Sequence, residues 1–400
     1  MRRSAVEGAA LLLALVLVVS ACTGGDGGDG AAATTSTVPP PAALPGGQDL
    51  YAPPDELLAG PPGSLVWFEE LPPIGAARAW RVLQRSTDAA GRPTWGTGLV
   101  FRPAADPPAD GFPVAVWAHG TAGLADRCAP SHAGAQVPAL GDLLQAGFVV
   151  VAPDGAGLGP PGPAQYLVGG AEGRALLDAA RAAAAIPGSD ASSEVALWGY
   201  SSGGQAALFA AQQAQDYAPD LDVLGTVAVA PVSDLARFAG RASTLPLTFG
   251  YSFLTFGAWA EVYDDADLGT IFTPAVIGEL PLLDQECAPA VAPHFALTSL
   301  DELRVADPQV TPPWPELMAT NSVAAVATEG PVLLVQGTED PIIAPESTDS
   351  LAARLCDAGA TVELRRIPGR HDVVLRQAAS IAEWLTERSA GVPAGTTCPS

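Results

Sequence analysis

The chain has 400 residues, of which 48% are hydrophobic and 16% charged, a composition that can bury a substantial core. Its formal net charge is -24, and all 19 basic residues are arginines. Because nucleic-acid affinity depends on cationic contacts to phosphates, this balance argues against a nucleic-acid-binding protein.

The N-terminus has the layout of a secretory signal. Arg2 and Arg3 precede an apolar stretch over residues 9–19, which is shorter than the roughly 20 residues that a membrane span needs. The stretch ends in VSAC, which resembles the lipobox of bacterial lipoproteins. We therefore predict a signal peptide over residues 1–21 and lipid attachment at Cys22, on the outer face of the cytoplasmic membrane. Ordinary cleavage, which would release a secreted protein, is the alternative.

The next segment, residues 22–64, is rich in Gly, Ala, Thr and Pro and offers little to bury. Such a composition is typical of a flexible tether, so the folded part is expected to begin near Leu65.

From Ala77 onward, short Val- and Leu-rich runs alternate with longer Ala-rich segments. This alternation predicts an α/β fold with a mostly parallel sheet between two layers of helices. Crossover helices are expected over residues 172–185 and 203–215. Eight strands are expected, over residues 77–86, 94–103, 113–120, 148–154, 194–201, 224–232, 332–337 and 362–369.

Residues 237–330 break the alternation and divide the core into residues 65–236 and 331–400. The interval is far longer than an ordinary connection between a strand and a helix. We interpret it as a helical cap over the carboxyl edge of the sheet, where open α/β folds bind ligands; a separate domain is the alternative. Its aromatic side chains are candidate walls for an alkyl chain or, equally, the core of the cap itself: Phe249, Tyr251, Phe253, Phe256 and Trp259.

The segment EVALWGYSSGGQAAL places Ser201 between Gly199 and Gly203, where an expected strand meets an expected helix. A G-x-S-x-G pattern at such a junction predicts a nucleophile elbow, a tight turn that exposes the serine hydroxyl. The pentapeptide alone also arises by chance in a chain rich in Gly and Ser. The interpretation therefore requires a base and an acid elsewhere in the chain.

On this fold the order along the chain is serine, acid, histidine. His371 follows the last expected strand, whereas the other downstream histidine, His294, lies within the expected cap. Asp340 comes just after the seventh strand, with Glu339 as its main competitor. We predict a catalytic triad of Ser201, Asp340 and His371.

The oxyanion that would form on an attacked carbonyl needs preorganised donors. The backbone N–H of Ser202 is one candidate, and the loop after the third strand, AHGTAG, offers Gly120 or Thr121 as the other. His119 in that loop is expected to pack or to form hydrogen bonds.

Taken together, these segments resemble the secretory lipase family of fungi and actinobacteria, of the Candida lipase A type. The resemblance covers most of residues 50–398 and rests on WAHGTAGLADRCAPS, VVVAPDGAGLG, ALWGYSSGGQAALFAA, VLLVQGTEDPIIAP and ARLCDAGATVELRRIPGRHD. It implies an α/β-hydrolase fold, the triad named above, and an acyl-binding tunnel shaped by the cap. The chain departs from the family at Gly155, where a bulkier residue is expected, and this departure bears on substrate size.

Four cysteines follow Cys22, an even number that favours two disulfides in an exported chain. Four cysteines allow three pairings, and the sequence alone does not choose among them. A bond between Cys128 and Cys287 would clamp the cap to the sheet, and one between Cys356 and Cys398 would pin the C-terminal tail. The resemblance implies this same arrangement.

The predicted function is hydrolysis of carboxylic esters, with acylglycerols as the favoured substrates, through an acyl-enzyme on Ser201. The alternatives are an acyltransferase that uses the same intermediate and a surface lipoprotein that binds lipid without catalysis. No cofactor is expected, and four histidines offer little for a metal site. We further expect a monomer.

Overall fold

The computed structural model describes residues 40–134, 136–242 and 246–399. The predicted signal peptide, Cys22 and the first part of the predicted tether lie outside the described residues. Within the described ranges the strands are Ala42–Ala43 (β1), Leu65–Ile74 (β2), Ala77–Thr87 (β3), Pro93–Arg102 (β4), Phe112–Ala118 (β5), Val149–Ala156 (β6), Ala191–Tyr200 (β7), Asp222–Val229 (β8), Val332–Gly337 (β9) and Val362–Ile367 (β10).

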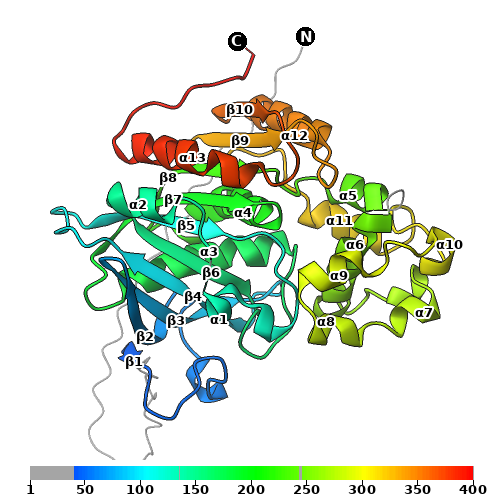
Figure 1. Ribbon diagram of the computed structural model, residues 1–400, viewed down its shortest axis with the longest axis horizontal. Coiled ribbons are helices and arrows are strands. Elements are labelled where there is room, and N and C mark those ends of the chain that lie inside the picture. The colour runs from blue at the N-terminus through cyan, green and yellow to red at the C-terminus, as the bar shows by residue number, and fades with distance from the viewer. Residues whose placement is uncertain (1–39, 135, 243–245, 400) are drawn as a thin grey trace, which may run out of the picture. The chain divides into compact units, whose positions relative to one another are not determined.

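These strands form one ten-stranded sheet in the order β1-β2-β3-β4-β6-β5-β7-β8-β9-β10 (Figure 1). Pairing is antiparallel from β2 to β4 and between β4 and β6, and it is parallel from β6 through to β10. The eight predicted strands are present as β3 to β10. Because the central strands run parallel, their carboxyl ends meet at one edge of the sheet.

Two strands, β1 and β2, are additional to the prediction and extend the antiparallel end of the sheet. Pro72 and Pro73 obscure β2 in the sequence, since proline is depleted in strands and is tolerated chiefly near sheet edges. β1 lies within the predicted tether, and Leu50 is buried against the same end of the sheet. The packed structure therefore begins before Leu65.

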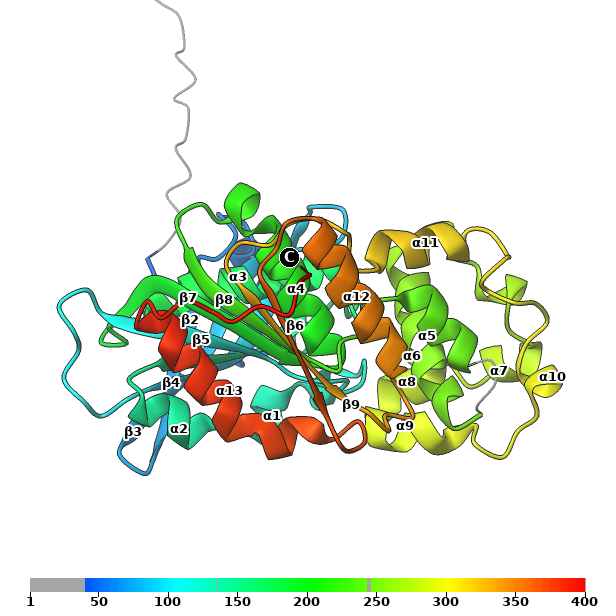
Figure 2. The same ribbon diagram turned by 90° about the horizontal axis from the view of Figure 1, so that it is seen from above.

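Helices cover both faces of the sheet (Figures 1 and 2). One face is covered by α3 (Gly169–Ala184), α4 (Ser202–Tyr217) and α12 (Pro345–Asp357), and the other by α2 (Leu140–Gln145) and α13 (Val373–Ser389). Alternate side chains of β5 face opposite layers, since Val116 packs with α3 and α4 whereas Trp117 packs with α13. The short α1 (Pro130–Ala133) follows β5.

Between β8 and β9, where the cap was predicted, the described chain is largely helical. The helices gather beside the sheet as a separate group (Figure 2). They are α5 (Leu235–Ala242), α6 (Pro246–Val262), α7 (Pro274–Ile277), α8 (Pro281–Gln285), α9 (Ala288–His294), α10 (Leu300–Leu303) and α11 (Trp314–Asn321). Buried aromatic residues form their shared core, which continues into the sheet domain at Tyr166 and Leu167.

The structure contains both predicted disulfides. Cys128, after β5, is bonded to Cys287 at the start of α9, and Cys356 of α12 is bonded to Cys398 near the C-terminus. The first bond ties the group of cap helices to the sheet domain, and the second ties the last described residues to α12.

Candidate active site

Ser201 lies at a tight turn between β7 and α4, with φ of 58° and ψ of -117°. A non-glycine residue in this region stores about 1–3 kcal/mol of strain, which the surrounding structure must offset. A Cβ atom at Gly199 would collide with the carbonyl oxygen of Gly203, and one at Gly203 would collide with that of Ala118. The two glycines of the motif are thus required sterically, and the turn has the geometry of a nucleophile elbow.

Three side chains from separate segments form a continuous chain of hydrogen bonds at the carboxyl edge. The hydroxyl of Ser201 donates to Nε2 of His371 at 3.0 Å, and Nδ1 of His371 donates to Oδ2 of Asp340 at 2.7 Å. The ring of Tyr200 packs on the imidazole with centroids 4.9 Å apart. This arrangement can transfer a proton from the serine hydroxyl to the imidazole while the carboxylate holds the ring.

Asp340 is 2% exposed and is held by several donors. Its Oδ1 accepts from the backbone N–H groups of Ile342 and Ile343 at 2.8 and 2.9 Å, and Nε2 of Gln336 donates to Oδ2 at 3.2 Å. Gln336 is itself fixed by Thr348, whose hydroxyl donates to Oε1 at 2.6 Å. Sequence reasoning missed Gln336, although a polar residue inside the apolar run VLLVQG was a signal for it.

The two residues that the sequence offered as alternatives to Asp340 and His371 lie outside this hydrogen-bond chain. Glu339 is exposed, and its backbone N–H donates to Gly369. His294 ends α9, where its Nε2 lies 3.4 Å from the carboxylate of Glu279. Neither residue lines the cavity that contains Ser201.

Ser201 and His371 line a cavity of about 840 Å³ with largely apolar walls. Of the five aromatic residues considered from the sequence, Tyr251 lines this cavity. Phe253 and Trp259, by contrast, are fully buried in the core of the cap. Phe249 and Phe256 are almost fully buried in the same core. The cavity walls come from the sheet domain, the cap and α13, and include Trp117, Val137, Tyr200, Val232, Phe238, Ile342, Val374 and Leu375.

The loop after β5 forms one wall of the same cavity, with Gly120 and Thr121 both in contact with it. Nδ1 of His119 donates to the carbonyl oxygen of Gly120 at 2.6 Å, and its Nε2 lies 2.9 Å from the carbonyl oxygen of Asp154. In a trans peptide the C=O and N–H point in opposite directions. His119 therefore forms hydrogen bonds, as the sequence allowed, and turns the N–H of Thr121 away from the imidazole.

Further contacts hold this loop from the sides. The Thr121 hydroxyl lies 2.7 Å from the hydroxyl of Tyr166 and 3.4 Å from that of Ser202. Ser202 is the first residue of α4, and N–H groups in the first turn of a helix have no partner within it. On the far side, the N–H of Ala288 in the cap donates to the carbonyl oxygen of Ala122 at 2.8 Å.

Residues 130–397 match the sequence model of a family described as Secretory lipase. The chain belongs to this family. Its membership and the two disulfides indicate an exported protein with a lipid ester as its substrate class. Among the described residues, no helix is both long and apolar enough to cross a membrane.

Among the relatives of this secretory lipase, a Mycobacterium tuberculosis protein named as a probable inactive lipase is 29% identical over 384 residues, covering 88% of this chain and 83% of its own. Lipase A of Arthroderma benhamiae is 24% identical over 397 residues, covering 88% and 81%. The closed state of Candida antarctica lipase A superposes with a TM-score of 0.74 at 19% identity, covering 89% of each chain. These similarities show a lipase-like hydrolase with the α/β-hydrolase fold.

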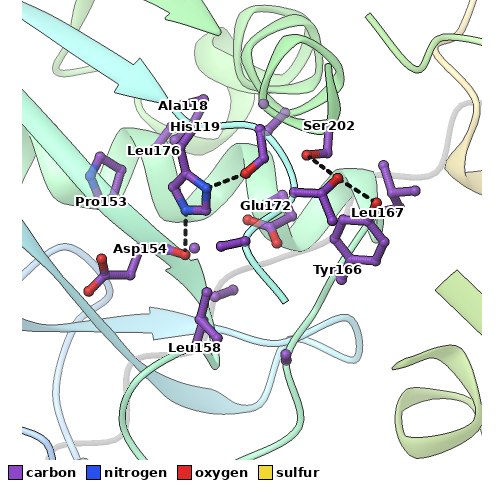
Figure 3. A pocket seen from close by; sticks show the side chains of 18 of the residues that line it. Ala118, His119, Pro153, Asp154, Leu158, Tyr166, Leu167, Glu172, Leu176 and Ser202 are labelled. Atoms are coloured by element: carbon purple, nitrogen blue, oxygen red, sulfur yellow. Dashed lines mark hydrogen bonds between the residues drawn. The ribbon is translucent and has the colours of Figure 1, made fainter. Parts of the chain in front are cut away.

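A second, smaller cavity of about 40 Å³ shares this loop as a wall and is lined by Glu172 (Figure 3). Burial raises the pKa of Glu172 to about 8. A Cβ at Gly155, where φ is +101°, would lie 3.0 Å from Oε2 of Glu172. In this member of the family Gly155 thus makes room for a buried carboxyl, and it does not line the cavity that contains Ser201. Sequence reasoning missed Glu172.

Proposed function

We propose that the protein is a serine esterase or lipase that hydrolyses carboxylic esters, acylglycerols in particular, through an acyl-enzyme on Ser201. The observation that carries this proposal is the unbroken hydrogen-bond chain from Ser201 through His371 to Asp340. The cavity of about 840 Å³ around Ser201 supports it, because an acyl chain gains about 0.8 kcal/mol for each methylene that it buries.

In the proposed reaction His371 takes the proton of Ser201 as the hydroxyl oxygen attacks the ester carbonyl. The negative charge that develops on the carbonyl oxygen is stabilised by the backbone N–H groups of Ser202 and Thr121, the latter directed by His119. We favour Thr121 over Gly120 as the donor because the Gly120 carbonyl is held by His119. The protonated imidazole then gives its proton to the leaving alcohol, and water activated by His371 hydrolyses the acyl-enzyme.

An acyltransferase would form the same acyl-enzyme and pass it to an alcohol in place of water, so product analysis distinguishes the two. Catalysis is favoured over lipid binding alone because every triad hydrogen bond is in place, although one relative is named as inactive. We further propose that export uses residues 1–21 as a signal peptide and that Cys22 carries a lipid anchor.

The test is covalent labelling with a fluorophosphonate probe, together with hydrolysis of p-nitrophenyl esters from acetate to palmitate. The wild-type protein should be labelled and should hydrolyse at least part of the series. Ser201→Ala should lose labelling and lower kcat by at least about 10⁴-fold, because it removes the nucleophile. A matched control is Ser380→Ala, which removes a hydroxyl on α13 that bonds to Gln377 within the same helix. Undiminished labelling of Ser201→Ala would contradict the proposal.

A further inference from the structure

The small cavity has largely apolar walls, into which a few polar side chains are set. Side chains of His119, Thr121, Tyr166, Glu172 and Ser202 line it. Figure 3 shows the Glu172 carboxyl between His119 on one side and Tyr166 and Ser202 on the other. Its volume of about 40 Å³ is enough for a few water molecules, each of which needs roughly 10–15 Å³ on this measure. Glu172 thus shares a cavity with Thr121 and Ser202, the residues that offer the proposed oxyanion donors.

Glu172 has no cationic partner among the described residues. Arg174, two residues further along α3, donates instead to the hydroxyl of Thr87 and the carbonyl oxygen of Asp88. A backbone interaction with Ala156 lowers the pKa of the Glu172 carboxyl, but by less than burial raises it. Glu172 is half-buried as a residue and lines the cavity, and a carboxylate that loses solvent with so little compensation favours its neutral form.

The other titratable groups that face the cavity have their own partners. His119, at the end of β5, binds two backbone carbonyl oxygens. The carboxyl of Asp154, in β6, accepts from Thr97 and Ser131. Tyr166, in the segment before α3, shares a hydrogen bond with Thr121. Glu172 is therefore the carboxyl of this cavity for which no side-chain hydrogen bond is found among the described residues.

We propose, on the basis of the proposed function, that Glu172 is a positioning residue whose neutral carboxyl supports the loop and whose ionisation lowers turnover. A negative charge behind the loop opposes the negative charge that develops on the substrate oxygen in front of it. This repulsion is stronger the more the protein excludes water from the space between the two charges. Because burial raises the pKa of Glu172 to about 8, turnover is lost as the solution becomes mildly alkaline.

The test compares kcat and KM of the full chain for p-nitrophenyl butyrate between pH 7 and pH 9, corrected for spontaneous hydrolysis. If the ionised form is inactive, a group of pKa about 8 lowers the wild-type kcat about tenfold over this interval. Glu172→Gln cannot ionise, so its kcat should change less than twofold, with KM unaffected. The ratio of the two kcat values at each pH cancels the effect of every titrating group that both proteins share.

Asp178→Asn is the matched control. Asp178 lies on the same helix, and burial raises its pKa to about 6, but it binds Ser86 and Tyr217 away from the cavity. This variant should show the wild-type fall between pH 7 and pH 9. A Glu172→Gln enzyme that falls tenfold like the wild type would overturn the inference and leave the proposed function intact.

A second measurement does not depend on turnover. The infrared carbonyl band of a protonated carboxyl should disappear from the wild-type spectrum with a midpoint near pH 8 and should be missing in Glu172→Gln. A carboxyl that is already ionised at pH 7 would also overturn the inference. A wild-type chain that neither hydrolyses esters nor reacts with the fluorophosphonate would overturn the proposed function, and the inference with it.

Discussion

The two cavities that share the loop after β5 as a wall differ in size and in the reactive side chains that line them. The one with Ser201 and His371 has a volume of about 840 Å³, whereas the one with Glu172 has about 40 Å³, and the walls of both are largely apolar. Both contain His119, Gly120, Thr121 and Tyr166 in their walls. In our proposals the large cavity takes the substrate, while the carboxyl in the small one acts on the loop that both share.

The largest expected effect follows from breaking the hydrogen-bond chain on the substrate side. Asp340→Asn should lower kcat by about 10⁴-fold, because an amide at this position favours the wrong imidazole tautomer. Steady-state kinetics with p-nitrophenyl butyrate measures the loss. Glu339→Gln is the control, since Glu339 is exposed and should leave kcat unchanged. A comparable loss in both variants would contradict the assignment of Asp340.

A second pair of variants separates the wall of the large cavity from the core of the cap. Phe253→Ala should destabilise the protein by about 3–5 kcal/mol, since Phe253 is completely buried among aromatic neighbours. Tyr251→Ala should instead lower kcat/KM for laurate about fivefold relative to acetate, because it shortens the apolar wall by a side chain worth about 1 kcal/mol of contact. Denaturant unfolding and an ester series measure the two effects. An unchanged chain-length profile in Tyr251→Ala would remove this residue from the acyl site.

The smallest expected effect concerns stability on the side of Glu172. Because its pKa is raised from 4.5 to about 8 in the folded protein, the folded state binds more protons than the unfolded state between these values. The contribution of Glu172 to the free energy of unfolding is therefore largest below about pH 4.5 and is lost as the pH rises through 8. Glu172→Gln avoids this loss, so its Tm should exceed that of the wild type by a few degrees more at pH 9 than at pH 5. Equal Tm differences at the two pH values would contradict the burial of an ionisable carboxyl.

The features that the sequence predicted correctly depend on local patterns. Runs such as FVVVA and VLLV are apolar on both faces, and this identifies the central strands before any packing is known. The tight turn at the nucleophile can be recognised from five consecutive residues, because its steric requirements fall on Gly199, Ser201 and Gly203. The positions of Asp340 and His371 follow once the strands are placed, because a loop after a parallel strand opens at the same edge.

The features that the sequence did not predict depend on tertiary packing. α6 is apolar around its whole circumference, so its pattern did not indicate that Tyr251 faces the substrate cavity while Phe253 faces the cap core. In the sequence Glu172 resembles an ordinary acid in the first turn of a helix. Its burial depends on Gly155 and on the loop after β5, both distant in the chain. The glycine at position 155, where a bulkier residue was expected, was the one signal in the sequence. Its meaning became clear only when the structure placed the carboxyl of Glu172 beside it.

The disulfide arrangement has a consequence for how the protein matures. Of the four cysteines in the described region, the first pairs with the second and the third with the fourth. When the polypeptide emerges N-terminus first, Cys128 and Cys287 become available before Cys356 and Cys398. The native bond between the first two can therefore close before either crossed partner has appeared. Order of emergence alone thus favours the correct pairing, and the cap is fastened beside the loop after β5 while the C-terminal strands are still to be added.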